Sequence, residues 1–139
     1  TTAGSHLSRA GRLAELLDEL ARTPNVRGTP AGRAMTDAAA ERYAALIPTR
    51  AEAIVGLVGV LAADGRGTEA FGRIEQFSRT LPARVRAMAG LAIVRAGAAS
   101  DRQATTVLGW LEACLAEDPT SAGLRMNRAE FMALRNDTA

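Results

Sequence analysis

The fold is indicated most clearly by one stretch, AEAIVGLVGVLAADGRGTEAFGRIEQFSRTLPAR, residues 51–84. Its first part places apolar side chains every three or four residues, the spacing of an amphipathic helix, at Ile54, Leu57 and Leu61. Asp64-Gly65-Arg66-Gly67 then interrupts the pattern as a short turn between helices. A second apolar run follows and ends at Pro82, because the residue before a proline is disfavoured in a helix. The stretch therefore predicts a helical hairpin.

The rest of the chain repeats this pattern without any convincing β alternation. A further hairpin is expected near the N-terminus, with helices over 7–22 and from Thr36-Asp37 as cap to about 47, joined by a long loop over 23–35. After residue 82 we expect helices over 83–96, from the turn at 98–101 to Asp118, and over 121–134. The prediction is an all-α chain of about seven helices in sequential antiparallel hairpins.

An internal period accompanies the helices. Pro48 and Pro82 lie 34 residues apart, each at the end of a hairpin, and Pro119 follows 37 residues later. A 34-residue helix-turn-helix unit that ends in proline resembles the tetratricopeptide repeat (TPR) family. In residues 51–84, the positions typical of that family hold Ile54, Leu57, Leu61, Gly65, Ala70, Ile74, Phe77 and Pro82.

The resemblance covers residues 51–137, with one good repeat and two partial ones. In the second unit Met88, Leu91 and Ala92 agree with the family pattern, whereas Arg95 and Val107 depart from it. Asn127-Arg128-Ala129, Met132 and 134–137 resemble the first helix of a third unit. An irregular helical bundle or another α-solenoid would give similar spacings and stays open as an alternative.

The remaining parts of the chain complete a single domain. The 7–48 hairpin does not fit the repeat because its loop is too long. Residues 1–6 are expected to be a disordered tail, and Gly4-Ser5-His6 resembles the scar of a cleaved tag. No stretch is long and apolar enough to span a membrane, and no signal-peptide pattern is present, so we expect a cytoplasmic protein that does not bind membranes.

Composition excludes several kinds of function. The net charge is only +2, so no electrostatic footprint for nucleic acid exists. All seventeen basic residues are arginines, which excludes a catalytic Schiff-base lysine and a P-loop lysine. The only histidine, His6, lies in the expected tail, so a Ser-His-Asp or Cys-His arrangement is not expected. The single cysteine, Cys114, falls on an apolar helix face and is interpreted as a small buried side chain.

Acidic residues do not form a metal-binding pattern. We interpret Glu15, Asp18 and Glu19 as a solvated helix face, and Asp64, Asp101 and Asp137 as turn or capping residues. Glu112, Glu117 and Asp118 share one helix with no opposing acidic helix. The sequence therefore predicts no enzyme activity, no metal and no cofactor.

A binding surface is implied by the TPR resemblance, since the first helix of each unit lines the concave side of such a stack. The residues expected to be exposed there are Glu52, Val55, Gly59, Ala62, Arg86, Ala89, Ile93, Ala96, Met126, Asn127 and Glu130. This lining is small and apolar, which suits an apolar or amphipathic peptide or protein partner. We expect an adaptor or regulatory module within a larger bacterial protein.

Two other occupants of this surface stay open. A second copy of the chain would make the protein a homodimer and a self-associating structural domain, and a segment of the parent protein could cover the same residues.

Overall fold

The computed structural model describes residues 2–22 and 28–137, and within them the chain is all-helical. The described residues form seven α-helices and no strand, which confirms the all-α prediction. Their bounds are α1 Thr2–Arg22, α2 Pro30–Leu46, α3 Ala53–Ala63, α4 Gly67–Phe77, α5 Ala83–Arg95, α6 Asp101–Glu117 and α7 Ala122–Asp137.

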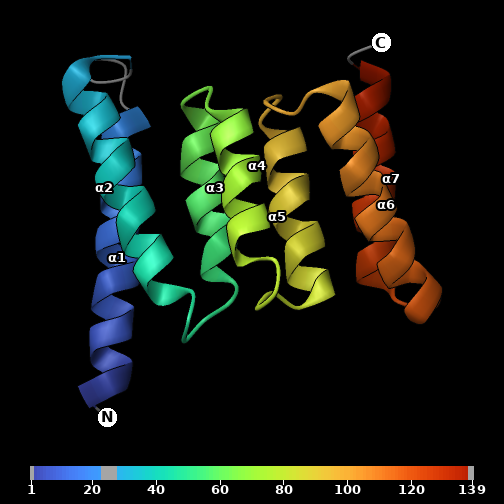
Figure 1. The fold of residues 1–139 in the computed structure, drawn as a ribbon, viewed down its shortest axis with the longest axis horizontal. Coiled ribbons are helices and arrows are strands. Elements are labelled where there is room, and N and C mark those ends of the chain that lie inside the picture. The colour runs from blue at the N-terminus through green and yellow to red at the C-terminus, as the bar shows by residue number, and fades with distance from the viewer. Residues whose placement is uncertain (1, 23–27, 138–139) are drawn as a thin grey trace.

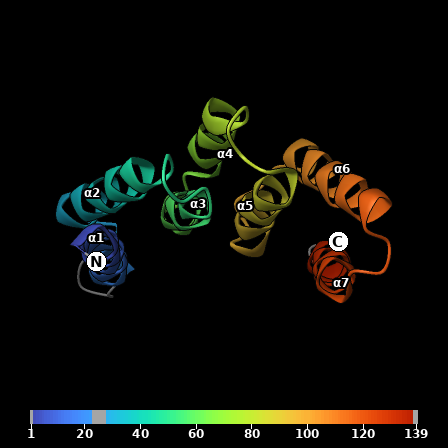
Figure 2. The same cartoon turned by 90° about the horizontal axis from the view of Figure 1, so that it is seen from below.

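The helices lie in two rows (Figures 1 and 2). α1, α3, α5 and α7 form one row, and α2, α4 and α6 form the other. Contacts join α3 to α2, α4 and α5, and join α5 to α4, α6 and α7. Each hairpin therefore packs on the next one along the chain. The row of odd-numbered helices lies on the inner side of a shallow curve, as seen along the helices.

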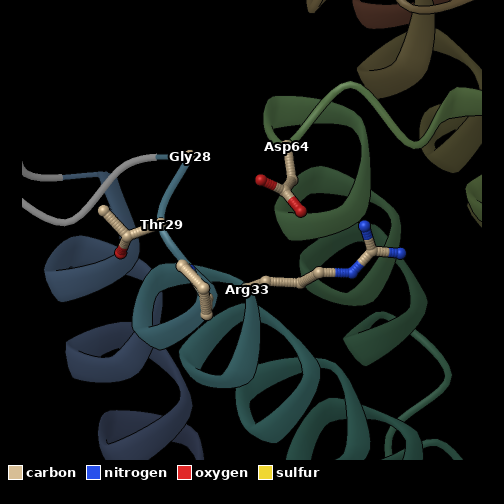
Figure 3. Close-up of a pocket in the computed structure, with 5 residues that line it drawn as sticks. Gly28, Thr29, Arg33 and Asp64 are labelled. Atoms are coloured by element: carbon tan, nitrogen blue, oxygen red, sulfur yellow. The ribbon is translucent and has the colours of Figure 1, made fainter.

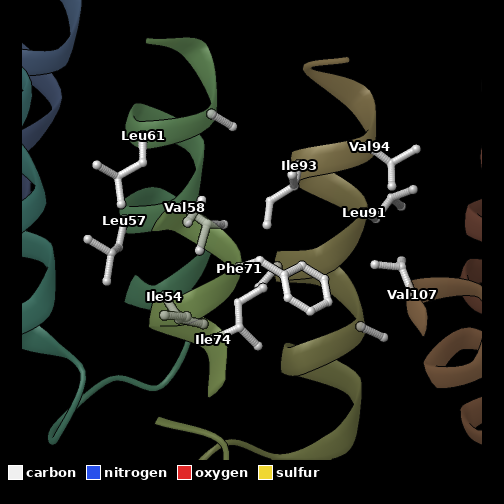
Figure 4. Close-up of a cluster of buried hydrophobic side chains, with 14 of the residues drawn as sticks. Ile54, Leu57, Val58, Leu61, Phe71, Ile74, Leu91, Ile93, Val94 and Val107 are labelled. Carbon is white, nitrogen blue, oxygen red and sulfur yellow. The ribbon is translucent and has the colours of Figure 1, made fainter. Parts of the chain in front are cut away.

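The core runs through the middle of this arrangement (Figure 4). α3 has a mean hydropathy far above that of the other helices, and its Ile54, Leu57 and Val58 are fully buried. Ile74 of α4 and Ile93 of α5 close over it from two sides. A helix that is apolar on nearly every face belongs in a core, which explains why α3 has neighbours in both rows.

The turns after α3 and α5 have the same backbone geometry. Gly65 and Gly97 both adopt a positive φ, of 76° and 71°, which side-chain-bearing residues rarely do. After α3, the amide of Arg66 donates to the carbonyl of Leu61, and after α5 the amide of Ala98 donates to that of Ile93. These are Schellman caps, so the predicted glycine turn at Gly65 is confirmed and a second one occurs at Gly97.

The start of α2 differs from the prediction. The sequence predicts a loop over 23–35, whereas the helix begins at Pro30. Thr29 is the N-cap: its hydroxyl accepts from the amide of Gly32 at 3.0 Å. Proline suits the first helical position because its missing N–H would have no partner there. The predicted cap at Thr36-Asp37 is wrong, since Thr36 is buried within α2; residues 23–27 of the predicted loop lie outside the described residues.

α1 also differs from the prediction, both in the residue at which it begins and in the face that it buries. It begins at Thr2, so residues 2–6 are helical rather than a disordered tail; they contain no proline to stop the helix. Among residues 11–22 of α1, the buried ones are the small Ala14 and Ala21. Of the leucines whose spacing predicts this helix, Leu17 is half-buried against the core, whereas Leu13, Leu16 and Leu20 are exposed.

A cluster of ion pairs joins α2 to the α3–α4 turn. The guanidinium of Arg66 lies 2.6 Å from the carboxylate of Asp37 on α2 and 2.7 Å from that of Glu69 on α4. Asp64 lies at 3.6 Å. These carboxylates raise the pKa of Arg66, and the hydrogen bond from Arg66 lowers the pKa of Glu69. Asp37 therefore links two hairpins instead of capping a helix.

Candidate functional site

The main candidate site is a groove on the inner side of the curve, between α1, α3 and α5. It encloses about 410 Å³. Ten residues line it, and we call this surface the inner groove: Asp18, Arg22, Tyr43, Val55, Gly56, Gly59, Ala63, Ala92, Arg95 and Ala96.

The floor of the inner groove consists of small residues. Gly59 and Ala63 lie one turn apart on α3, and Ala92 and Ala96 lie one turn apart on α5. A Cβ atom added at Gly59 would meet nothing within 4 Å, so the space above it is open. A floor without large side chains lets the backbone or an apolar side chain of a bound segment approach α3 and α5 closely.

Tyr43 reaches the inner groove because α3 has a glycine where its ring lies. A Cβ atom at Gly56 would come within 2.5 Å of the Tyr43 ring, so the ring packs directly on the α3 backbone. Burial raises the pKa of the Tyr43 phenol, and the charges of Asp18 and Glu15 raise it further. The hydroxyl therefore stays protonated and available as a hydrogen-bond donor at neutral pH.

One ion pair lies on each side of this floor. On α1, Arg22 lies 3.0 Å from Asp18, one helical turn away. On the far side, the guanidinium of Arg95 binds the carboxylate of Glu130 on α7 through two hydrogen bonds, of 3.0 and 2.7 Å. Burial raises the pKa of Asp18, an effect that Arg22 opposes, whereas the bond from Arg95 lowers the pKa of Glu130. Each arginine thus has a carboxylate beside it, and neither side of the groove has a strong net charge.

The structure brings together only some of the eleven residues predicted for the concave face. Val55, Gly59 and Ala96 line the inner groove, and Glu52 is exposed just before α3 begins. Ala62, Ala89 and Ile93 are buried in the core, so the expectation that they are exposed is wrong. A charged substitution at Ile93 would therefore test folding rather than binding.

The error on α5 is one of register. The buried positions of α3 recur on α5 after 33 residues, not 34: Ile54 corresponds to Ala87, Val58 to Leu91 and Leu61 to Val94. A shift of one residue rotates a helix position by about 100°. The groove positions of α5 are consequently Ala92 and Ala96, and the fully buried Ile93 lies beside them in sequence.

Arg86 and the predicted α7 residues do not line the inner groove, although Glu130 binds its lining residue Arg95. The guanidinium of Arg86 lies 5.0 Å from the ring centroid of Trp110, which stacks on Phe71 at 5.4 Å, so Arg86 contacts the other row. The amide of Asn127 donates to the sulfur of Met88, and Glu130 holds Arg95; both join α7 to α5. Met126 is 71% exposed.

Sequence reasoning missed the residues that α1 and α2 contribute, namely Asp18, Arg22 and Tyr43. The long loop between these helices separates them from the repeat pattern, so that pattern assigns no groove positions to them. One signal was available: Asp18 and Arg22 are an acidic-basic pair four residues apart, a spacing that places them side by side on a helix. The predicted solvated face at Asp18 is instead a partly buried pair.

A second hollow of about 410 Å³ lies between the start of α2 and the end of α3 (Figure 3). Its lining comprises Gly28, Thr29, Pro30, Arg33 and Asp64. The Thr29 hydroxyl accepts the capping bond of α2, and Arg33 and Asp64 contribute one charge of each sign. The two charges cancel, so the side chains of this lining offer no net positive charge to an anion.

Cys114 is buried, and burial together with the charge of Glu117 raises the pKa of its thiol. No three His, Cys, Asp or Glu side chains in the described ranges lie close enough to hold a metal ion. No helix there has the length and apolar character needed to cross a membrane.

Comparisons of the chain with known proteins identified no related protein. The sequence matches no profile of a known family, and neither curated proteins nor solved structures gave a significant match. Functional inference therefore rests on the geometry of the chain itself.

Proposed function

We propose that this chain is a protein-interaction module, with hairpins stacked as in the tetratricopeptide class, that binds a peptide segment in the inner groove. The observation that carries the proposal is the open, small-residue floor at Gly59, Ala63, Ala92 and Ala96. Peptide-binding surfaces of helical repeats lie on the inner side of their curve, and the inner groove lies there as well.

The chemistry of the groove defines the ligand. Its floor accepts apolar side chains, whereas Tyr43 offers a hydroxyl and the flanking pairs offer both signs of charge. An amphipathic segment satisfies both parts, with apolar residues on the floor and polar residues toward Arg22 and Arg95. Since each arginine already has a carboxylate beside it, a strongly acidic ligand gains little there.

The proposal is tested by selecting binders from a displayed library of random peptides with the purified full chain. Gly59→Leu fills the floor, because the glycine sits in mid-helix beneath open space. Gly72→Leu is the matched control: Gly72 is also a mid-helix glycine with nothing within 4 Å of an added Cβ, but it is on α4 in the other row.

Selected peptides are expected to lose affinity for Gly59→Leu by at least about tenfold, the effect of removing one well-placed apolar contact, and to keep it for Gly72→Leu. Failure to enrich any peptide, or equal binding to both variants, would contradict the proposal. Far-UV circular dichroism of both variants verifies that each is folded.

A further inference from the structure

The strongest feature outside the inner groove is the outer face of α1, where large apolar side chains are exposed. Within residues 11–22, the side of α1 that packs on the rest of the protein consists mostly of small residues: Ala14 and Ala21 are buried, Gly11 contacts Leu46, and Leu17 is a half-buried leucine packed against the core. Leu13, Leu16 and Leu20, on a different face, are 38%, 49% and 48% exposed. An isolated helix would gain more by burying its leucines than its alanines.

These three leucines form one stripe. Their spacing of three and then four residues places them in line along α1 and is the spacing of an interface between two helices. We call Leu13, Leu16 and Leu20 the leucine stripe. It lies roughly a third of a turn from the surface of Ala14 and Ala21 that contacts α2, so α2 leaves it accessible.

We propose that the leucine stripe pairs antiparallel with the same stripe of a second copy of the chain, forming a symmetric dimer. The charged residues beside the stripe favour a second copy of the chain as the partner and an antiparallel arrangement of the two helices. Arg12 and Glu19 flank the stripe on the side away from α2, and neither forms an ion pair within the described part of the chain.

A two-fold axis perpendicular to the helices places this flank of one copy against the same flank of the other. When the two stripes are superposed in opposite directions, Arg12 of each copy comes alongside Glu19 of the other. The dimer thus forms two reciprocal Arg12–Glu19 pairs, and every leucine of the stripe faces a leucine-rich surface.

Dimerisation leaves the inner groove open. Asp18 and Arg22, its α1 residues, project from the side of the helix opposite the leucine stripe. The dimer would therefore present two grooves, and failure of either proposal would not affect the other.

The test is the absolute mass of the full chain by light scattering after size-exclusion chromatography, over a wide concentration range. We expect a mass that rises from 14.5 kDa to twice that value. A mass that stays at one chain up to about 1 mM, where even a weak dimer is populated, would overturn the proposal. A mass that rises beyond two chains would also overturn it, because a symmetric pair is closed.

Variants distinguish the surface and its orientation. Leu16→Glu is expected to abolish the dimer, and Met126→Glu, an exposed apolar position on α7 at the other end, is expected to leave it unchanged. Arg12→Glu and Glu19→Arg each place like charges together and should weaken the dimer about tenfold, as expected for two exposed pairs. Arg12→Glu combined with Glu19→Arg should restore it. A dimer lost in Met126→Glu, or no rescue in the charge-swapped chain, would contradict the pairing; circular dichroism verifies folding.

Discussion

Arg95 on α5 and Glu130 on α7 form a two-point ion pair, with distances of 3.0 and 2.7 Å between their nitrogen and oxygen atoms. This pair fixes α7 against α5 and orients Arg95 beside the inner groove. Planar, bidentate geometry is the arrangement in which arginine and a carboxylate bind best.

The Arg95–Glu130 pair should contribute little to global stability, because the two side chains are 54% and 38% exposed and water screens their charges. We expect a coupling of about 0.5 kcal/mol between Arg95→Ala and Glu130→Ala in a double-mutant cycle. The measurement is the free energy of unfolding in urea for the four chains. A coupling near zero would mean that the pair does not form in solution.

Acid should destabilise the protein through Glu69 and Glu130, whose pKa values are lowered by Arg66 and Arg95. The lowered pKa means that the unfolded chain binds protons first as the pH falls, so this stability is complete above the ordinary pKa of 4.5 and disappears below it. Changing both residues to glutamine should make the free energy of unfolding depend less on pH between 6 and 3. An unchanged dependence would exclude these two carboxylates as its source. Asp18, whose pKa is raised by burial, acts in the opposite sense: its contribution falls as the pH rises.

Two glycines of α4 should respond oppositely to alanine. A Cβ at Gly67 would lie 1.9 Å from the carbonyl oxygen of Ala98, a backbone atom that cannot easily move. Gly67→Ala should therefore cost about 1–3 kcal/mol, the usual cost of overpacking. Gly72→Ala should add about 0.5–1 kcal/mol, because it meets open space and alanine favours the helix. Thermal and urea unfolding measure both; a loss in both variants would refute the close approach of Gly67 to Ala98.

Cys114 should react slowly with a thiol reagent in the folded protein. It is 7% exposed, and burial and the charge of Glu117 raise its pKa above the ordinary 9.0, so less thiolate is present at neutral pH. The rate of modification by a chromogenic disulfide should rise strongly in denaturant. Equal rates in the folded and unfolded chain would show that the helices packed on α6 do not cover the thiol.

The succession of helices could be predicted from the sequence because its breaks are local. Pro82 and Gly65 stop or turn the chain through their own backbone properties, and both lie between helices in the structure. The start of α2 was predicted wrongly because proline can begin a helix as well as end one. Pro30 was interpreted as a breaker, although with Thr29 before it the same residue begins a helix.

The groove could be predicted only in part, because burial depends on the surface that a helix meets. Periodicity identifies an apolar face but does not fix which neighbouring face is packed. On α1, Ala14 and Ala21 fit closely against α2, whereas Leu16 on another face stays exposed. On α5, a difference of one residue in the repeat exchanged Ile93 for Ala92. Such shifts are tertiary properties that no local pattern specifies.

The stack of Phe71 on Trp110, with Arg86 on the same indole ring, makes the middle of the molecule optically distinguishable. Trp110 is the single tryptophan, and the three residues come from α4, α6 and α5. Its fluorescence therefore reports on the central hairpins, whereas far-UV circular dichroism averages over all helices. In a row of units stabilised mainly by their neighbours, the ends can unfold before the centre. The indole would then keep its native emission while part of the helical signal is already lost. A comparison of the two signals during unfolding would therefore show whether the end helices unfold before the central ones.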